Sequence, residues 1–284
     1  MALFGRVTIV GLGLIGGSLG MALKRRRLVS EVIGLSRSEA TLRQAKRRGV
    51  IDWGTTDPRR AVEQSDIVIL ATPVETIVPL AKQLARFMPA GSILTDVGSV
   101  KSGIVRALES KLSRKIAFVG AHPLAGSEQR GIKAADARLF DGSTCIVTKT
   151  ARTNLVALKR VVRFWKTLLP QVSVMSPKQH DRLLAAVSHL PHWIAFSLVN
   201  ATEKSALAIA PRSFLDATRV AQSDPALWDD IFFSNRTALM RAMKQFDRHW
   251  QQLRTHLSRG NRATLLRLLM SAHARRHALQ DRSR

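Results

Sequence analysis

A short β-branched run near the start of the chain leads straight into a cluster of glycines. The run is Val7-Thr8-Ile9-Val10, and the spacing Gly11-x-Gly13-x-x-Gly16 follows it and opens a helix-like segment. In this context the first glycine makes a tight turn, the second lets a pyrophosphate approach the backbone, and the third lets the helix pack against the strand. Free N–H groups at the helix N-terminus then face the phosphates. The pattern predicts a dinucleotide-binding site formed by Gly11, Gly13, Leu14, Ile15 and Gly16. The alternative is a glycine-rich turn that binds no ligand.

Short apolar runs alternate with helix-like segments over the first part of the chain. The strand-like runs are 7–10, 31–35, 66–70, 92–96, 117–119, 144–148 and 171–175. This alternation is typical of βαβ units and of a parallel sheet covered on both faces. Beyond Pro177 only helical spacing is left, in the segments 178–205, 229–257 and 262–277. We therefore expect an α/β Rossmann-type domain over residues 1–175 and an all-α domain over residues 176–284.

The composition is that of an ordinary soluble protein. The chain has 284 residues, 45% of them hydrophobic, and no uninterrupted apolar run reaches the roughly 18 residues of a membrane span. The apolar stretch from Val7 runs into four basic residues from Lys24 without a small-residue cleavage site, so we expect no signal peptide. The only cysteine is Cys145, which excludes an internal disulfide and a cysteine-based zinc cluster. These features favour a cytoplasmic location.

The charge is strongly basic, with 45 Lys and Arg against 20 Asp and Glu and a net charge of +25. The excess is spread along the chain: 28 basic and 12 acidic residues lie up to residue 175, and 17 and 8 lie beyond it. Aromatic residues make up 5% and tyrosine is absent, so no basic patch is interleaved with aromatics. We expect a surface that attracts anions in general. A dinucleotide-sensing regulator that binds nucleic acid is the remote alternative.

The residues after the second strand-like run bear on which dinucleotide is bound. A site for NAD usually has Asp or Glu there, about 20 residues after the glycines, to bind the ribose 2′-hydroxyl. This chain has Ser36 and Arg37 instead. A carboxylate would repel a 2′-phosphate, whereas a hydroxyl and a guanidinium bind it through charge-assisted hydrogen bonds. The pair favours NADP over NAD, unless Arg37 is simply a solvated surface arginine.

Ser99 and His122 each follow a predicted strand, and ligands of doubly wound sheets bind outside the carboxyl ends of the strands. Both residues should therefore face the nicotinamide crevice. A histidine there accepts a proton from a substrate hydroxyl while hydride leaves the same carbon. The remaining histidines in polar helical surroundings are expected to be ordinary core or surface residues: His180, His249, His256, His273 and His277.

A second histidine pair lies in VSHLPHW, residues 187–193, where His189 and His192 flank a Leu-Pro pair. Imidazoles three residues apart are compatible with a metal site. The chain lacks a neighbouring carboxylate pattern of the HExxH type, however, so we expect no metal. Pro191 has no N–H and would weaken or bend a helix locally, which would turn His192 toward a substrate.

Together these segments resemble the prephenate/arogenate dehydrogenase family of tyrosine biosynthesis. The matching segments follow the family's order along almost the whole chain: GLGLIGGS (11–18), ATPV (71–74), TDVGSVK (95–101), HPLAGSE (122–128), HD (180–181), SHLPH (188–192) and FLDATRVAQSDPALWDDI (214–231). The resemblance implies a nucleotide-binding domain followed by a helical domain that forms a homodimer. It also implies oxidative decarboxylation of prephenate to 4-hydroxyphenylpyruvate, with NAD(P)⁺ as hydride acceptor.

The resemblance implies roles for individual residues as well. His122 corresponds to the catalytic histidine that accepts the proton of the ring hydroxyl, and Ser99 to the serine that helps to orient both groups. Arg219 corresponds to the arginine that binds a substrate carboxylate, which suits a planar, permanently charged side chain. The other residues implied on the substrate side are Ser188, His189, His192, Ser127, Glu128, Asp216 and Ser223, and those added to the cofactor site are Thr72 and Pro73.

One segment departs from the family pattern. Members often have a glycine-rich run just before the Phe-x-Asp segment, where this chain has Ala210-Pro211-Arg212-Ser213. The difference affects the local shape of the pocket, and with it the choice between the keto substrate prephenate and the amino substrate arogenate. An arogenate dehydrogenase, or a dual-substrate cyclohexadienyl dehydrogenase, is the nearest alternative.

Overall fold

The computed structural model describes residues 3–113, 115–127 and 129–280. The chain divides into two compact units, Met1–Arg236 and Thr237–Arg284. The first unit holds the sheet and the helices up to α11. The boundary expected near residue 175 lies within this unit, at the point where strands give way to helices, and as a division between domains it stays a prediction.

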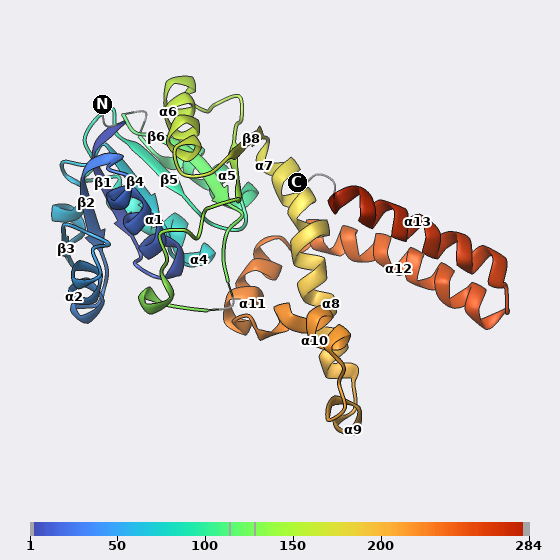
Figure 1. Cartoon of the computed structure of the whole chain (residues 1–284). Helices are drawn as coiled ribbons and strands as arrows, with labels where there is room; N and C mark the ends of the chain where they lie inside the picture. The colour runs from blue at the N-terminus through green and yellow to red at the C-terminus, as the bar shows by residue number, and fades with distance from the viewer. Residues whose placement is uncertain (1–2, 114, 128, 281–284) are drawn as a thin grey trace. The chain divides into compact units, whose positions relative to one another are not determined.

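One eight-stranded sheet with the order β3-β2-β1-β4-β5-β6-β7-β8 forms the base of the first unit (Figure 1). Neighbouring strands from β3 to β6 are parallel, β7 is antiparallel to β6, and β8 is parallel to β7. The strands are β1 Phe4–Val10, β2 Val29–Leu35, β3 Trp53–Thr55, β4 Ile67–Leu70, β5 Ile93–Asp96, β6 Ala117–Pro123, β7 Thr144–Thr148 and β8 Gln171–Met175. The expected Rossmann-type α/β fold is confirmed. The sequence missed only β3, because three residues at a sheet edge carry no apolar run.

Helices cover both faces of this sheet, as expected. They are α1 Leu14–Arg25, α2 Glu39–Arg47, α3 Pro58–Val62, α4 Val74–Leu84, α5 Ser102–Lys111 and α6 Leu155–Lys166. Polar side chains cap three of them: Ser38 accepts a hydrogen bond from an N–H of α2, Asp57 from α3 and Asn154 from α6. The first turn of α1 has no such cap, which matters for the site below.

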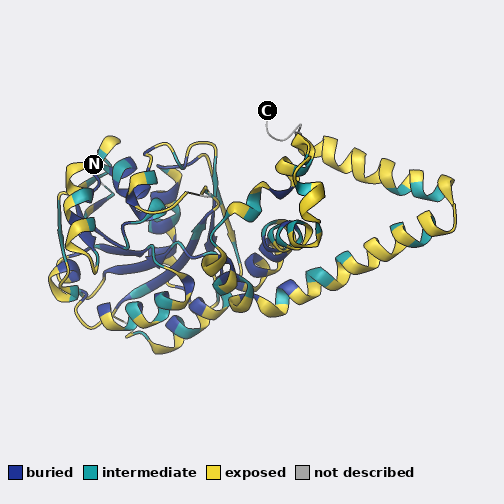
Figure 2. Cartoon of the chain, turned by 90° about the horizontal axis from the view of Figure 1, so that it is seen from below, coloured by how far each residue is buried: buried dark blue, intermediate teal, exposed yellow. Residues whose placement is uncertain are grey.

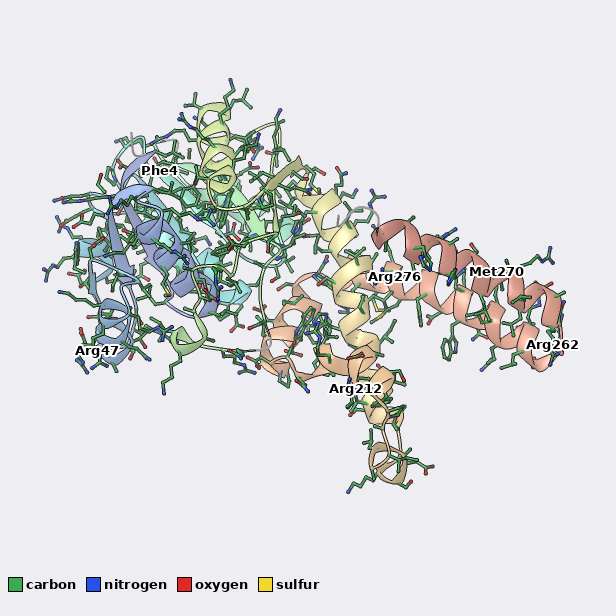
Figure 3. All side chains as sticks on the ribbon, viewed as in Figure 1. Phe4, Arg47, Arg212, Arg262, Met270 and Arg276 are labelled. Atoms are coloured by element: carbon green, nitrogen blue, oxygen red, sulfur yellow. The ribbon has the colours of Figure 1, made fainter. Side chains whose placement is uncertain are left out.

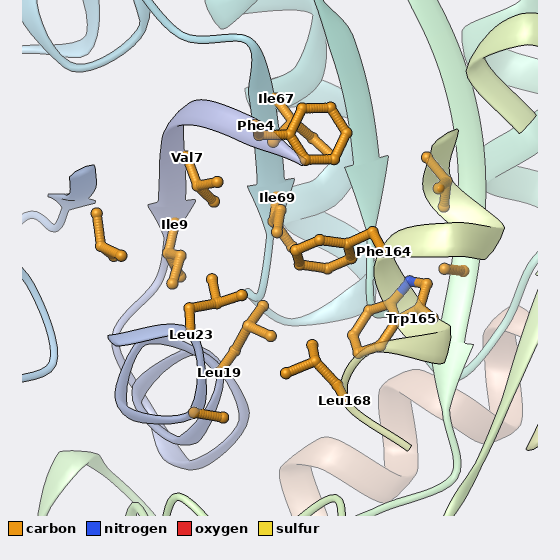
Figure 4. Packing of buried hydrophobic residues seen from close by; sticks show 14 of the residues in the cluster. Phe4, Val7, Ile9, Leu19, Leu23, Ile67, Ile69, Phe164, Trp165 and Leu168 are labelled. Carbon is orange, nitrogen blue, oxygen red and sulfur yellow. The ribbon is translucent and has the colours of Figure 1, made fainter. Parts of the chain in front are cut away.

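Two apolar clusters hold the helices to the sheet. In the first cluster, Ile9 of β1 and Leu19 of α1 pack with Phe164 and Trp165 of α6 (Figure 4). The second cluster packs α4 and α5 against strands β4 and β5, and Ile77 of α4 is wholly buried in it. Because each cluster removes apolar surface from water on its own side of the sheet, the strand ends are held rigidly.

A nearly continuous helix follows β8. It consists of α7 Pro177–Leu184, a π-helical segment Ala185–His189 and α8 Leu190–Ala201; the first unit then continues with α9 Lys204–Leu207, α10 Arg212–Thr218, a 3₁₀ turn Arg219–Gln222 and α11 Pro225–Ser234. By length and composition the helix Pro177–Ala201 could cross a membrane, a test that core helices of soluble proteins also pass. The buried His180, Asp181 and His189 lie on this helix.

The second unit contains most of α12 Arg236–Ser258 and all of α13 Arg262–Gln280, joined by a turn in which Gly260 has a φ of +62°. Most of its side chains are exposed (Figure 2). Arg262 and Arg276 of α13 are exposed, as are Arg47 and Arg212 in the first unit (Figure 3). The basic excess therefore belongs to the surface of both units.

Candidate active site

The glycine loop has the close contacts that its spacing predicts. Gly11 has a φ of +90°, and a Cβ there would lie 2.6 Å from the Ala71 carbonyl oxygen. A Cβ at Gly16 would lie 2.0 Å from the Gly11 oxygen, so α1 approaches β1 as only glycine allows. A Cβ at Gly13 would meet nothing within 4 Å. The second glycine therefore faces open space, as a pyrophosphate-binding position requires.

The first turn of α1 is free to bind an anion. Gly13 is the N-cap and its turn carries neither a side-chain cap nor an acidic residue. The N–H groups of this turn lack intrahelical acceptors and lie at the positive end of the helix dipole. Leu14 and Ile15 are half-buried in the same turn. These residues fit the pyrophosphate of a dinucleotide.

The other predicted cofactor residues lie at the same edge of the sheet. The Gly11 N–H donates to the Leu35 carbonyl at 3.0 Å, so Ser36 and Arg37 follow directly beside the loop. Ser36 is half-buried and Arg37 is exposed. Thr72 and Pro73 follow β4, the strand on the other side of β1. A cavity of about 430 Å³ beside Gly13 is lined by Leu12, Gly13, Thr41, Gln44, Arg130, Gly131, Ile132 and Lys133.

His122 contacts a second histidine, His180, which was not among the predicted site residues. His122 lies on β6, and its Nδ1 is 2.9 Å from Nε2 of His180 on α7. His180 was expected to be an ordinary core or surface residue; it is wholly buried, and α7, which begins at Pro177, brings its imidazole to the end of β6. Its Nδ1 lies 2.8 Å from Asp181 Oδ1. The His-Asp dipeptide of the family pattern was the available signal.

His122 is held in its neutral form. Burial lowers the pKa of His122 well below its usual value, and electrostatic interactions with His180, Lys101 and His189 lower it further. A neutral imidazole has one bare nitrogen, so His122 can accept a proton near neutral pH. The side chain is only partly buried, which leaves it accessible to a substrate.

A buried ion pair lies beneath this histidine. Lys101 and Asp96 are both wholly buried, and the Lys101 ammonium contacts the Asp96 carboxylate. The ammonium also donates to the Ala121 carbonyl, next to His122, at 2.9 Å. Ser99 lies in the same loop between β5 and α5 and is half-buried. Lys101 was not predicted as a site residue, although a lysine in an otherwise apolar segment is a signal that could have identified it.

The two histidines of VSHLPHW, His189 and His192, have different surroundings and different partners. The π-helical segment ends at His189, which is buried, and its Nδ1 lies 3.1 Å from the Asn235 amide nitrogen. His192 is half-buried and stacks on Trp228, with ring centroids 3.5 Å apart. Burial lowers the pKa of His192. The hydrogen bond to the Ser188 carbonyl acts in the opposite direction, and the nearby charge of Arg219 lowers the pKa further. No group of three metal-binding side chains exists among the described residues.

The remaining predicted substrate residues are more loosely arranged. Arg219 begins the 3₁₀ turn after α10 and is close enough to His192 for its charge to act there. Asp216 and Ser127 are exposed, and Ser188 and Ser223 are half-buried. Glu128 lies outside the described residues. Next to Ser223, Asp224 forms an ion pair with Arg130, which links α11 to the loop after β6.

The chain matches two family models over consecutive ranges. Residues 19–174 match the model described as prephenate dehydrogenase, nucleotide-binding domain, and residues 176–271 match prephenate dehydrogenase, dimerization domain. A prephenate dehydrogenase of Bacillus subtilis is 32% identical over 98% of this chain and 77% of its own length. A cyclohexadienyl dehydrogenase of Zymomonas mobilis is 34% identical over 99% of this chain and 98% of its own.

Solved structures are similar over the same span. The prephenate dehydrogenase of Aquifex aeolicus, in complex with hydroxyphenyl propionate and NAD⁺, matches with a TM-score of 0.90 and 34% identity, covering 97% of this chain and 98% of that one. The arogenate dehydrogenase of Synechocystis matches with a TM-score of 0.84 and 31% identity, covering 96% and 99%.

Proposed function

Because this chain belongs to the prephenate dehydrogenase family, we propose that it catalyses the oxidative decarboxylation of prephenate to 4-hydroxyphenylpyruvate. The observation that carries the proposal is the neutral, partly buried His122 at the edge of the sheet where the glycine loop opens. Bound NAD(P)⁺ would supply the acceptor for the hydride lost from C4. The glycine loop, Ser36, Arg37, Thr72 and Pro73 would hold it.

His122 acts as the proton acceptor in this proposal. It takes the proton of the C4 hydroxyl while hydride leaves C4, so that a carbonyl forms there. The C1 carboxylate then leaves as CO₂, and its bonding electron pair enters the ring. The oxygen at C4 regains a proton and becomes the phenol. Because aromatisation drives this sequence, the protein has only to position the substrate and move one proton. Ser99 would orient the hydroxyl and His122.

Arg219 and His192 form the substrate side. A guanidinium binds a carboxylate through two parallel hydrogen bonds, which suits a substrate with two carboxylates. Trp228 holds the His192 ring by stacking. The other residues assigned to this side are Ser127, Glu128, Ser188, His189, Asp216 and Ser223. The basic surface, with a net charge of +25, would draw in the anionic substrate and cofactor.

The decisive experiment compares His122→Asn with His277→Asn. His277 is exposed on α13, beyond the range that matches the dimerization domain, so it is a matched control. Turnover of prephenate is followed through the absorbance of the reduced cofactor. We expect His122→Asn to lose about 10²–10⁴-fold in kcat with cofactor binding retained, and His277→Asn to behave as wild type. Near wild-type turnover by His122→Asn would refute the assignment.

We infer a preference for NADP over NAD. Ser36 and Arg37 lie beside the glycine loop, where an NAD enzyme usually has a carboxylate. Replacing Arg37 by Ala should raise the KM for NADP⁺ about tenfold or more and leave the KM for NAD⁺ nearly unchanged, because one charge-assisted bond is lost. An equal effect on both cofactors would argue against the preference.

Prephenate is proposed ahead of arogenate, and the relatives include enzymes named for both. The segment Ala210-Pro211-Arg212-Ser213 is the place where this chain departs from the family pattern. Steady-state kinetics with both substrates separate the possibilities. A kcat/KM for arogenate above that for prephenate would make the enzyme an arogenate or cyclohexadienyl dehydrogenase.

We also propose a homodimer formed through the helices after residue 176. Large apolar side chains are exposed there on the single chain, including Ile209 at 83% and Phe233 at 69%. Apolar side chains that are exposed on the single chain would be covered when two chains pair through these helices. Light scattering on the purified protein should report twice the 31.4 kDa mass of one chain. We place the enzyme in the cytoplasm, where a chain with a single free cysteine needs no oxidising compartment.

A further inference from the structure

His180 and Asp181 are buried next to the proposed base, although the proposed reaction assigns them no step. His180 is 0% exposed and Asp181 is 5% exposed. Burying polar side chains costs free energy unless each finds a partner. Every polar atom of this dipeptide's side chains has one, and the partners connect α7, the start of α5 and the end of β6.

Asp181 is held as an ionised acceptor. Its two oxygens accept hydrogen bonds from the backbone N–H groups of Lys101 and Ser102, both at 2.8 Å, at the N-terminus of α5. Burial works to raise the pKa of Asp181, but the hydrogen bonds from His180, Ser102 and Lys101 outweigh it, and the pKa is lowered. An ionised carboxylate can only accept. The hydrogen between Asp181 and His180 therefore lies on His180 Nδ1.

The hydrogen on His180 Nδ1 determines where the hydrogen between His180 and His122 lies. Burial lowers the pKa of His180 despite the opposing bond to Asp181, so the ring is neutral and carries one hydrogen. Its Nε2 is then a bare acceptor, 2.9 Å from His122 Nδ1. Two bare nitrogens at that distance would repel each other. His122 Nδ1 must donate, and because His122 is also neutral, its Nε2 is left bare.

We propose that Asp181 and His180 are positioning residues that set the tautomer of His122, so that Nε2 of His122 is the atom that accepts the substrate's proton. The catalytic part of this inference rests on the proposed function. When Nε2 takes up the proton, the imidazolium of His122 keeps its bond to His180, whose far side is held by a carboxylate. The negative charge of Asp181 thereby stabilises the positive charge that forms on His122, although Asp181 is separated from the substrate by His180 and His122.

The charges around the relay formed by Asp181, His180 and His122 agree with this role. Lys101 lies on the side of β6, and its ammonium is held by Asp96 and the Ala121 carbonyl. His189 of the π-helical segment lies on the side of α7 and α8. The positive charge of Lys101 disfavours protonation of His122 before a substrate arrives, in addition to burial. The bonds from Asp181 through His180 orient the ring, and burial and Lys101 keep it unprotonated.

The first test reads the tautomer directly. Protein labelled with ¹⁵N in its histidines is examined by NMR at neutral pH, and the His122 signals are assigned by their loss in His122→Asn. We expect His122 and His180 each to carry the proton on Nδ1 and to have a bare Nε2. A His122 signal with the proton on Nε2 would overturn the proposal. This measurement does not depend on turnover, so it stands apart from the proposed function.

The second test compares two substitutions of the same residue. His180→Gln keeps an oxygen near the position of Nε2 that can accept from His122, whereas His180→Leu fills the space without an acceptor. We expect His180→Leu to lose about 10²–10³-fold in kcat, with the KM for substrate and the cofactor Kd within about threefold of wild type. His180→Gln should recover at least about tenfold of that loss.

Equal losses in the two variants would show a packing role only and would refute the relay. Wild-type kcat in His180→Leu would do the same. If the wild-type protein turns over neither prephenate nor arogenate, the proposed function fails, and the NMR result then decides the tautomer by itself. Circular dichroism of both variants confirms that each is folded before the kinetics are compared.

Discussion

Replacing Gly16 by Ala tests the closest contact of the cofactor site. A Cβ at Gly16 would lie 2.0 Å from the Gly11 carbonyl oxygen, with Ala71 Cβ and Ile9 Cγ2 at 3.1 Å. Non-bonded heavy atoms prefer about 3.5–4.0 Å, so α1 has to move away from the loop by roughly 1.5 Å. Overpacking costs about 1–3 kcal/mol or more, and the better helix propensity of alanine returns at most about 1 kcal/mol. We expect a net loss of about 2 kcal/mol in the free energy of unfolding.

The same shift should weaken cofactor binding. If it removes one backbone hydrogen bond to a phosphate, about 1.5–3 kcal/mol is lost, which is roughly 10- to 150-fold in Kd. Urea denaturation and titration calorimetry measure the two effects. Gly103→Ala is the control, because Gly103 also lies in the first turn of a helix and a Cβ there meets nothing within 4 Å. Wild-type stability and cofactor Kd in Gly16→Ala would refute the reasoning.

Three further predictions concern His189, Lys101 and Arg219. His189 has a pKa of about 4 in the folded chain and about 6.5 in the unfolded chain. When the pH falls from 6.5 to 4, the unfolded chain gains a proton at this residue and the folded chain does not. The free energy of unfolding should therefore fall by up to about 3 kcal/mol over this range. Acid titration of wild type and His189→Gln, monitored by fluorescence, checks this, since the variant should lose that part of the slope. Lys101→Met should cost about 3–5 kcal/mol because it leaves Asp96 buried and unpaired, and denaturation should show a smaller cost when Asp96→Leu is added. Arg219→Lys should raise the KM for substrate and leave the cofactor Kd unchanged; a rise in both would contradict the carboxylate role.

Local patterns are enough for much of this molecule. A β-branched run that ends in Gly11-x-Gly13-x-x-Gly16 permits little besides a tight strand–helix turn, because a Cβ at the first or third glycine would collide with backbone. The period of the apolar residues likewise identifies the strands of the first 175 residues apart from β3, and the long helical segments after Pro177, but it does not identify α10. His122 could be singled out because polar residues at the carboxyl end of a parallel strand face the ligand side.

Only the tertiary structure assigns the roles of the other histidines. His180 lies 58 residues from His122 in the chain, and the His-Asp dipeptide by itself does not tell a buried partner from an exposed helical residue. His189, the last residue of the π-helical segment, turns inward to Asn235, whereas His192 in α8 stacks on Trp228. Sequence spacing treats these two as equivalent. Their burial and partners depend on contacts between distant segments, and those contacts form only when the sheet and the helices pack together.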